Sequence, residues 1–323
     1  MLKNCVLFTL SANQELGKKV AAALGMELSP VSVKRFPSGE IIAESIETVR
    51  GKNVYIIQST CPPVNENLME LLIFVDSLKR SSAAEINVII PYFGYARQDR
   101  KAKPRQPISA RLVADLLKVS GVTRVVTVDL HAPQIQGFFS CLVDELATAP
   151  LYVATFLQDS HFNTKKLVTV SPDHGGVTRA RKIADGLNTT LAIIDKRRNS
   201  RLEPEVMNII GSVEGKDCLI VDDMIDTAGS ACAAADALIN AGAKSVKIIA
   251  THAVLSDPAF ERLSKSKFNQ IIVSDSIPLP ERFKELNCKV ISLAPMLAAS
   301  IKKIQLGEPL SVVYDMYKVE DHD

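Results

Sequence analysis

The chain has 323 residues, 47% of them hydrophobic, which is enough for two α/β domains with their own cores. Its 38 basic and 36 acidic residues leave a formal charge of only +2. Because the net charge is too small to attract polyanions to the protein as a whole, we expect no nucleic-acid partner and no membrane partner. Any site that binds an anion must depend on a local group of basic residues.

The start of the chain and the cysteines indicate a reducing compartment. The apolar run from Val6 to Phe8 is too short for a signal peptide, and no apolar stretch approaches the roughly 20 residues that span a bilayer. The six cysteines are scattered without a C-x-x-C pair, which favours free thiols over a disulfide framework or a zinc site. We therefore expect a cytoplasmic protein.

Short runs rich in Val and Ile alternate with longer segments of helical period, a pattern typical of parallel strands joined by crossover helices. The segment 67–80 is predicted to be such a helix, because its leucines share one side and its charged residues another. The continuously apolar strands suit sheets that are covered on both faces. The expected strands are 54–58, 86–91, 125–129, 167–171, 191–195, 218–222, 246–251 and 270–274.

The two halves of the chain are alike at low resolution. Val49 to Asn53 opens one series of strands and helices, and the similar Val213 to Asp217 opens another. Gly-Lys turns before strands are common, so duplication stays an open alternative on this pattern alone. We place the domain boundary in the polar region after Thr148, which gives domains of residues 1–150 and 151–323.

The segment from Cys218 to Ser230 combines an apolar strand, two adjacent carboxylates and a polar loop that leads into a helical stretch. The strand delivers Asp222 and Asp223 to its C-terminal end, where open α/β sheets bind ligands. Adjacent carboxylates can accept hydrogen bonds from the two neighbouring hydroxyls of a ribose. The pair is therefore predicted to orient a sugar.

The loop after these carboxylates is predicted to bind a phosphate group. Its N–H groups and the dipole of the following helix attract anions, and glycine lets the backbone approach a ligand. An alternative is that Asp226 or Thr227 simply caps the helix. A cap accounts for one side chain but not for the whole loop, which consists of Asp226, Thr227, Ala228, Gly229 and Ser230.

Two basic clusters follow expected strands, one from Arg97 to Lys101 and one from Lys196 to Arg201. Each suits a polyphosphate, and each also fits a solvated loop. The chain contains neither G-x-x-x-x-G-K-[ST] nor G-x-G-x-x-G, so a nucleotide would have to be held by these local cations.

His131 and Asp173 each follow an expected strand, so both can reach a cleft at the carboxyl ends of the sheets. A histidine in such a position is more often simply hydrogen-bonded, and Mg²⁺ prefers oxygen ligands. From the residues alone, a metal site and an ordinary hydrogen bond stay alternatives.

The segment 218–230 resembles the phosphoribosyl-diphosphate-binding motif of type I phosphoribosyltransferases and ribose-phosphate diphosphokinases. The segments 92–101, 129–139 and 171–176 resemble the class I diphosphokinases, and the resemblance extends from about Phe36 to the last strand. It implies an α/β fold with two similar domains of the type I phosphoribosyltransferase fold, each a mainly parallel sheet flanked by helices.

The resemblance also implies an activity. The β,γ-diphosphate of Mg-ATP would move to C1 of ribose 5-phosphate, giving phosphoribosyl diphosphate and AMP for nucleotide biosynthesis. ATP and ribose 5-phosphate would be the partners, Mg²⁺ the cofactor, and a homohexamer the assembly.

Site roles follow from the same resemblance, position by position. Lys196 and Arg198 would be catalytic, and His131 and Asp173 would bind Mg²⁺. ATP would contact Phe36, Ser38, Glu40, Arg97 and Gln98. Ribose 5-phosphate would contact Asp222, Asp223, Asp226, Thr227, Ala228, Gly229 and Ser230.

The sequence departs from the family pattern at a few positions. Ser38 stands where much of the family has Asp or Asn, and Pro309 stands where many members have a serine that helps form a phosphate or ADP regulatory site. Since proline offers neither a hydroxyl nor an N–H donor, we expect regulation by phosphate or ADP to be weaker here.

Two rival functions remain. A type I phosphoribosyltransferase shares the sugar-phosphate loop, but the ATP-side segments argue against it. A regulatory homologue that kept the fold and lost turnover is the other rival, and the presence of Lys196, Arg198, His131 and Asp173 argues against that.

Overall fold

The computed structural model describes residues 4–160, 162–197 and 206–318. The chain folds into two compact units. Unit 1 comprises Met1–Ala147, Ser276–Pro278 and Ser292–Val313, and unit 2 comprises Thr148–Asp275, Leu279–Ile291 and Tyr314–Asp323. The sequence analysis divided the chain once, between residues 150 and 151, and so did not include the return of two later segments to unit 1. No helix among the described residues combines the length and the apolar character needed to cross a bilayer.

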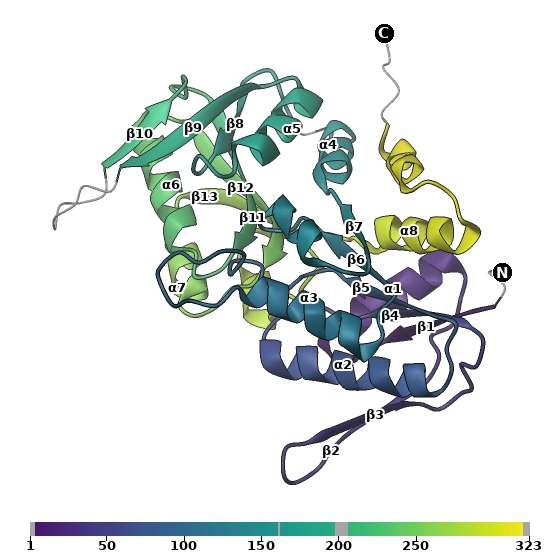
Figure 1. The fold of residues 1–323 in the computed structure, drawn as a ribbon. Coiled ribbons are helices and arrows are strands. Elements are labelled where there is room, and N and C mark those ends of the chain that lie inside the picture. The colour runs from purple at the N-terminus through teal and green to yellow at the C-terminus, as the bar shows by residue number, and fades with distance from the viewer. Residues whose placement is uncertain (1–3, 161, 198–205, 319–323) are drawn as a thin grey trace. The chain divides into compact units, whose positions relative to one another are not determined.

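Unit 1 is built on a parallel sheet of five strands in the order β1-β4-β5-β6-β7 (Figure 1). Three of these strands were predicted from their apolar runs, whereas β1 and β7 were not. The strands are β1 (Cys5–Thr9), β4 (Asn53–Ile57), β5 (Glu85–Ile90), β6 (Arg124–Val128) and β7 (Leu142–Leu146). The helices are α1 (Gln14–Leu24), α2 (Val64–Arg80), α3 (Ser109–Ser120) and α8 (Ala294–Leu306), with 3-10 turns at Ser11–Asn13 and Pro133–Phe138.

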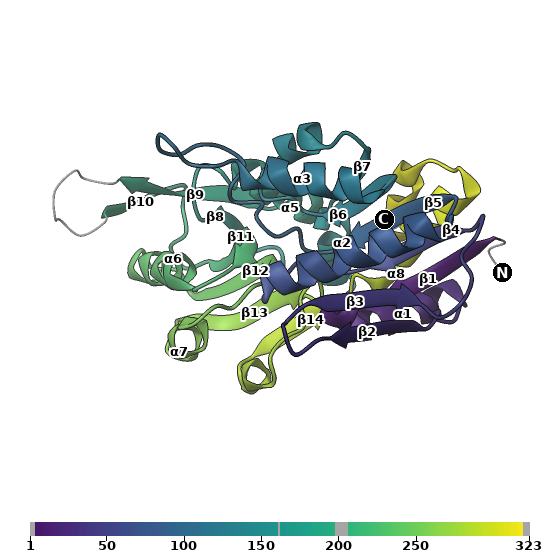
Figure 2. The same cartoon turned by 60° about the horizontal axis from the view of Figure 1, so that its bottom comes forward.

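A separate antiparallel hairpin of β2 (Val31–Arg35) and β3 (Ile41–Ser45) runs alongside α2 (Figure 2). The sequence analysis did not predict these strands, because their side chains are mostly half-buried or exposed and lack a continuous apolar run.

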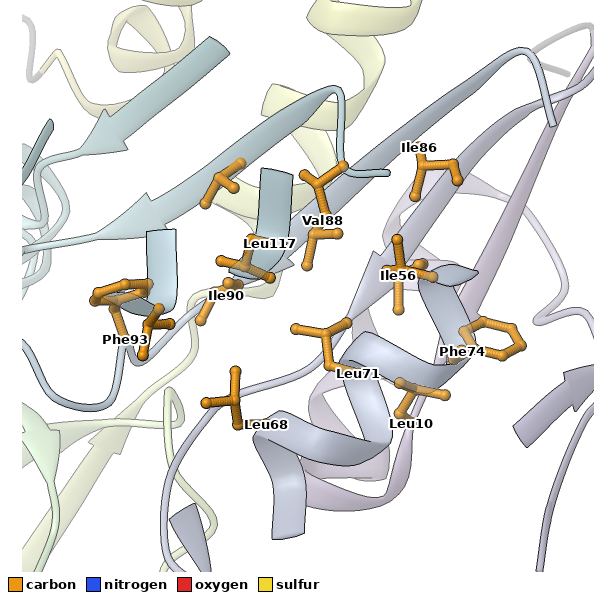
Figure 3. Close-up of a cluster of buried hydrophobic side chains, with 14 of the residues drawn as sticks. Leu10, Ile56, Leu68, Leu71, Phe74, Ile86, Val88, Ile90, Phe93 and Leu117 are labelled. Atoms are coloured by element: carbon orange, nitrogen blue, oxygen red, sulfur yellow. The ribbon is translucent and has the colours of Figure 1, made fainter. Parts of the chain in front are cut away.

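The core of unit 1 lies between the sheet and helices α2 and α3 (Figure 3). Leu71 and Phe74 of α2 are fully buried and belong to the same cluster as the strand residues Ile56 and Val88 (Figure 3). Phe74 also packs edge-on against Phe8, with 5.1 Å between ring centroids. The leucine side of the predicted helix is therefore its buried side, as the apolar period indicated.

Unit 2 contains a sheet of seven strands in the order β10-β9-β8-β11-β12-β13-β14, in which only the β9–β10 pair is antiparallel. The strands are β8 (Leu167–Ser171), β9 (Thr190–Arg197), β10 (Val206–Ile210), β11 (Asp217–Ile225), β12 (Ser245–Ala253), β13 (Phe268–Ser274) and β14 (Cys288–Ile291). The helices are α4 (Ala149–Leu157), α5 (Val177–Leu187), α6 (Gly229–Asn240) and α7 (Ala259–Ser264), with a 3-10 turn at Glu281–Glu285. A last 3-10 helix covers Leu310–Tyr317.

The core of unit 2 is packed around α6, whose buried side consists largely of alanine. Ala231, Ala234, Ala235 and Leu238 face the sheet. Such small side chains let the helix axis approach the strands closely and hold its N-terminus near the end of β11. All six cysteines are free thiols, as their spacing predicted.

Candidate functional site

The acidic pair lies within β11 rather than at its end. We predicted a strand that stops at Asp222, but β11 continues to Ile225 because its pairing with β12 continues that far. On its other side β11 pairs with β8 only from Asp217 to Ile220. Beyond Ile220 one side of the strand has lost its parallel neighbour, and this is where Asp222 and Asp223 lie.

The two carboxylates are close to each other and to one guanidinium. Asp223 is only 3% exposed, and its backbone N–H donates to Oδ1 of Asp222 over 2.8 Å. Nη1 of Arg179, on α5, lies 3.9 Å from Asp222 and 3.7 Å from Asp223. Burial and the neighbouring Asp223 carboxylate raise the pKa of Asp222, and Arg179 opposes that rise. The site therefore favours a ligand that donates hydrogen bonds.

The predicted phosphate loop connects β11 to α6. Ala228 has a left-handed conformation, with φ of 60°, and occupies the N-cap position before Gly229. The alternative in which Asp226 or Thr227 takes the N-cap position is therefore wrong. The alanine methyl cannot accept a hydrogen bond, so the helix N-terminus keeps the character of an anion site.

Asp173 and His174 belong to the turn between β8 and α5. Gly176 donates its N–H to Oδ1 of Asp173 over 2.9 Å, and the Ser171 hydroxyl donates to the Asp173 carbonyl over 2.7 Å. Nε2 of His174 lies 2.9 Å from Oδ1 of Asp195 on β9. These bonds fix the turn at the end of β8, next to the part of β11 that carries the acidic pair.

Of the two predicted catalytic residues, Lys196 lies near the end of β9. The backbone of Lys196 is part of that strand and pairs with Met207 of β10. Arg198 lies outside the described residues.

The predicted ATP residues all lie in unit 1. Phe36, Ser38 and Glu40 form the turn between β2 and β3, where the Phe36 N–H donates to the Glu40 carbonyl over 2.9 Å. The Ser38 hydroxyl donates to Oε2 of Glu40 over 2.7 Å, and the Phe36 side chain is 51% exposed. An exposed aromatic ring on a hairpin turn can stack on a planar base.

Arg97 and Gln98 are exposed in the loop between β5 and α3. Oε1 of Gln98 accepts from the Ser109 hydroxyl at the start of α3, over 2.6 Å. The Ala110 N–H also donates to the Gln98 carbonyl over 3.2 Å, so the start of α3 holds the backbone of this part of the loop.

His131 is exposed after β6 in unit 1, whereas Asp173 belongs to unit 2. Among the described residues, no group of three or more His, Cys, Asp or Glu side chains is arranged to hold a metal ion. One imidazole and one carboxylate do not make a protein-only Mg²⁺ site, although Mg²⁺ commonly takes one or two protein ligands together with substrate phosphates.

Sequence reasoning missed Arg179, which the structure places beside Asp222 and Asp223. The available signal was its position in the helix after β8, the strand that neighbours β11. A contact between separate βα units cannot be read from the spacing within either one.

The comparisons with known proteins agree along nearly the whole chain. Residues 5–121 match the family model for the N-terminal domain of ribose phosphate pyrophosphokinase, and residues 143–281 match the phosphoribosyl transferase domain. The ribose-phosphate pyrophosphokinase of Fusobacterium nucleatum is 52% identical over 312 residues, covering 97% of this chain and 98% of that protein. Ribose-phosphate pyrophosphokinase 1 of Streptococcus pneumoniae is 52% identical over 314 residues, covering 97% of each. The crystal structure of phosphoribosylpyrophosphate synthetase from Mycobacterium smegmatis has a TM-score of 0.89 at 42% identity, and covers 94% of this chain and 100% of that one.

Fold and site together define an enzyme of the phosphoribosyltransferase structural class, with parallel sheets flanked by helices and an acidic strand followed by a phosphate-type loop. The family can be specified further, because the model that matches residues 5–121 describes ribose phosphate pyrophosphokinases and the solved structure matches 94% of this chain. The chain belongs to the ribose-phosphate pyrophosphokinase family, also called diphosphokinases, whose members transfer a diphosphate group. The α/β fold and the family predicted from the sequence are confirmed.

Proposed function

We propose that this protein transfers the β,γ-diphosphate of Mg-ATP to C1 of ribose 5-phosphate, and that the phosphoribosyl diphosphate supplies nucleotide biosynthesis. The main support is the continuous placement of the acidic pair and the phosphate-type loop along β11 and the start of α6. Asp222 and Asp223 would accept hydrogen bonds from the ribose hydroxyls. Asp226, Thr227, Ala228, Gly229 and Ser230 would surround the 5-phosphate.

The proposed reaction is an in-line displacement. The C1 hydroxyl oxygen attacks the β-phosphorus, the bond from that phosphorus to the α,β-bridging oxygen breaks, and AMP leaves with that oxygen. The hydroxyl proton is released to solvent. Such transfers depend mainly on positioning and charge stabilisation, and Lys196 and Arg198 would meet the charge that develops on the diphosphate.

The nucleotide would be held by residues of unit 1. Phe36 would stack on adenine, Ser38 and Glu40 would contact the edge of the base, and Arg97 and Gln98 would contact the phosphate chain. His131 and Asp173 would be the protein groups that hold Mg²⁺, which would supply positive charge to the phosphates of ATP. As part of the same proposal, the protein acts in the cytoplasm as a homohexamer.

A direct assay tests the proposed activity, and each of the two rival functions predicts a different outcome in it. Purified protein with Mg-ATP and ribose 5-phosphate should release AMP and form phosphoribosyl diphosphate in equal amounts. A phosphoribosyltransferase would instead consume phosphoribosyl diphosphate in the presence of a free nucleobase. Absence of AMP release, together with binding of both substrates, would support a regulatory homologue and reject the proposed reaction.

A further inference from the structure

The segment proposed to hold ribose 5-phosphate carries no positive charge of its own. Residues 217–240 contain five aspartates and no lysine or arginine. A phosphate monoester carries a charge of about −1.5 to −2 at pH 7. The cations that balance this ligand and the aspartates must therefore come from neighbouring elements.

Arg179 supplies one such charge, at the end of the site where the sugar hydroxyls would lie. Its guanidinium lies 3.9 Å from Asp222 and 3.7 Å from Asp223. Since the acidic pair already engages this cation, the phosphate end needs a second source of positive charge.

Arg262 of α7 lies at that other end. Its Nη1 donates a hydrogen bond of 2.9 Å to the carbonyl of Thr227, in the middle of the loop. A Cβ built on Gly229 would come within 3.1 Å of the same Nη1 and 3.7 Å of Cζ. The guanidinium therefore lies directly against the backbone at Gly229 as well as at Thr227.

The helix that carries Arg262 is fixed against the core of unit 2. Ala259 and Leu263 of α7 are buried, with exposed fractions of 0% and 4%. Helices α6 and α7 lie side by side (Figure 1, Figure 2). Arg262 follows Ala259 by almost one turn, so the buried side chains set the position from which it reaches Thr227.

The field of Arg262 also reaches the first turn of α6. Burial and the Asp236 carboxylate raise the pKa of the Cys232 thiol, and Arg262 opposes that rise. The guanidinium thus adds positive charge at the same helix N-terminus that the loop presents to an anion.

We propose that Arg262 is a further recognition residue for the phosphate group of the sugar phosphate, and this rests on the proposed function. One N–H braces the Thr227 carbonyl and fixes the loop. Other donors of the five-donor guanidinium fork face the phosphate oxygens when the ligand binds. Arg262 thereby provides the cation that the loop sequence lacks.

The experiment compares Arg262→Gln and Arg262→Lys with Arg181→Gln, which removes an exposed arginine from α5 in the same unit. Calorimetry measures the Kd for ribose 5-phosphate and for Mg-ATP, and steady-state kinetics give kcat and both KM values. Loss of a charge-assisted contact should raise the Kd for ribose 5-phosphate about tenfold in Arg262→Gln. The Kd for Mg-ATP should stay unchanged, and Arg181→Gln should bind both ligands like the wild type.

Arg262→Lys should show a smaller loss, because lysine keeps the charge but lacks the fork that reaches both Thr227 and the phosphate. Unchanged affinity for ribose 5-phosphate in either folded variant overturns the role of Arg262. An equal loss of affinity for both substrates also overturns it, since that is the result of a general structural defect. If the wild type itself fails to bind ribose 5-phosphate, the proposed function fails instead.

Discussion

The carboxylates of Asp222 and Asp223 are neighbours along β11, and two such charges are unfavourable together away from water. Arg179 is 3.7 to 3.9 Å from them, a separation at which it offsets the repulsion without making a short hydrogen bond to either. The pair therefore binds protons more tightly than isolated carboxyls do. A ligand that donates hydroxyl hydrogens relieves this repulsion, so sugar binding and proton release are linked.

Asp222→Asn should change how stability depends on pH. Burial and Asp223 raise the pKa of Asp222 to about 8 in the folded protein, whereas an unfolded aspartate titrates near 4. Between these values the unfolded chain has released a proton that the folded chain retains, so this group lowers stability as pH rises. The variant lacks that penalty, and its Tm should exceed that of the wild type by an amount that grows from pH 5 to pH 8. Scanning calorimetry at several pH values checks this, and a constant difference would contradict it.

The same variant should raise the KM for ribose 5-phosphate more than that for ATP.

Lys196→Ala should lower kcat by about two to three orders of magnitude while ribose 5-phosphate still binds, because the lysine charge is needed mainly in the transition state. Calorimetric binding of ribose 5-phosphate beside a turnover assay separates the two effects. A kcat equal to that of the wild type would remove Lys196 from the mechanism.

At the scale of elements, the loop after β5 is held by the loop after β4. The Thr60 hydroxyl donates to the Tyr92 carbonyl over 3.1 Å and accepts from the Gly94 N–H over 2.7 Å. The Thr60 N–H also donates to the Tyr92 carbonyl over 2.9 Å. A Cβ on Gly94 would come within 2.4 Å of the Thr60 carbonyl oxygen, so only glycine fits there. These contacts fix the start of the loop that carries Arg97 and Gln98.

Thr60→Val should weaken binding of Mg-ATP and leave the affinity for ribose 5-phosphate unchanged. Valine keeps the shape but leaves the buried Gly94 N–H without its acceptor, at a cost of about 1–3 kcal/mol. Thr60→Ser retains the hydroxyl and is the matched control. Calorimetric titration of each variant with each substrate is the measurement; equal ATP affinity in Thr60→Val and Thr60→Ser would show that the bond does not position the loop.

Some helices and strands could be predicted from the sequence alone, and others could not. The Val- and Ile-rich runs located β4, β5, β6 and the central strands of unit 2, because continuous apolar character is a local property. The length of β11 was underestimated, since its last residues are ordered by pairing with β12. The contacts of Arg179 and Arg262 join separate βα units, and only the folded chain brings them to the acidic pair and the loop.

At the scale of the whole molecule, unit 1 is completed by residues from the far end of the chain. Helix α8 packs against α1, and Oε1 of Gln305 accepts from the Tyr55 hydroxyl over 3.0 Å and from Nδ2 of Asn53 over 3.3 Å. Burial raises the pKa of the Tyr55 phenol, so this group stays protonated and remains a donor. The Ser59 hydroxyl donates to the carbonyl of Ser276 over 2.5 Å, which ties a second late segment to the same unit. Unit 1 therefore contains hydrogen bonds and helix packing that depend on residues far along the chain.

Gln305→Leu should destabilise the protein although Gln305 is not one of the candidate site residues. The substitution leaves the buried Tyr55 hydroxyl without its acceptor, which costs about 1–3 kcal/mol and should lower the Tm by several degrees. Tyr55→Phe in the Gln305→Leu background removes that unmatched hydroxyl, so the double variant should recover part of the loss. Thermal unfolding of the wild type, both single variants and the double variant gives the coupling energy. Strictly additive effects would show that the hydrogen bond does not join α8 to β4, and the return of the C-terminal helix to unit 1 would then depend on its apolar contacts alone.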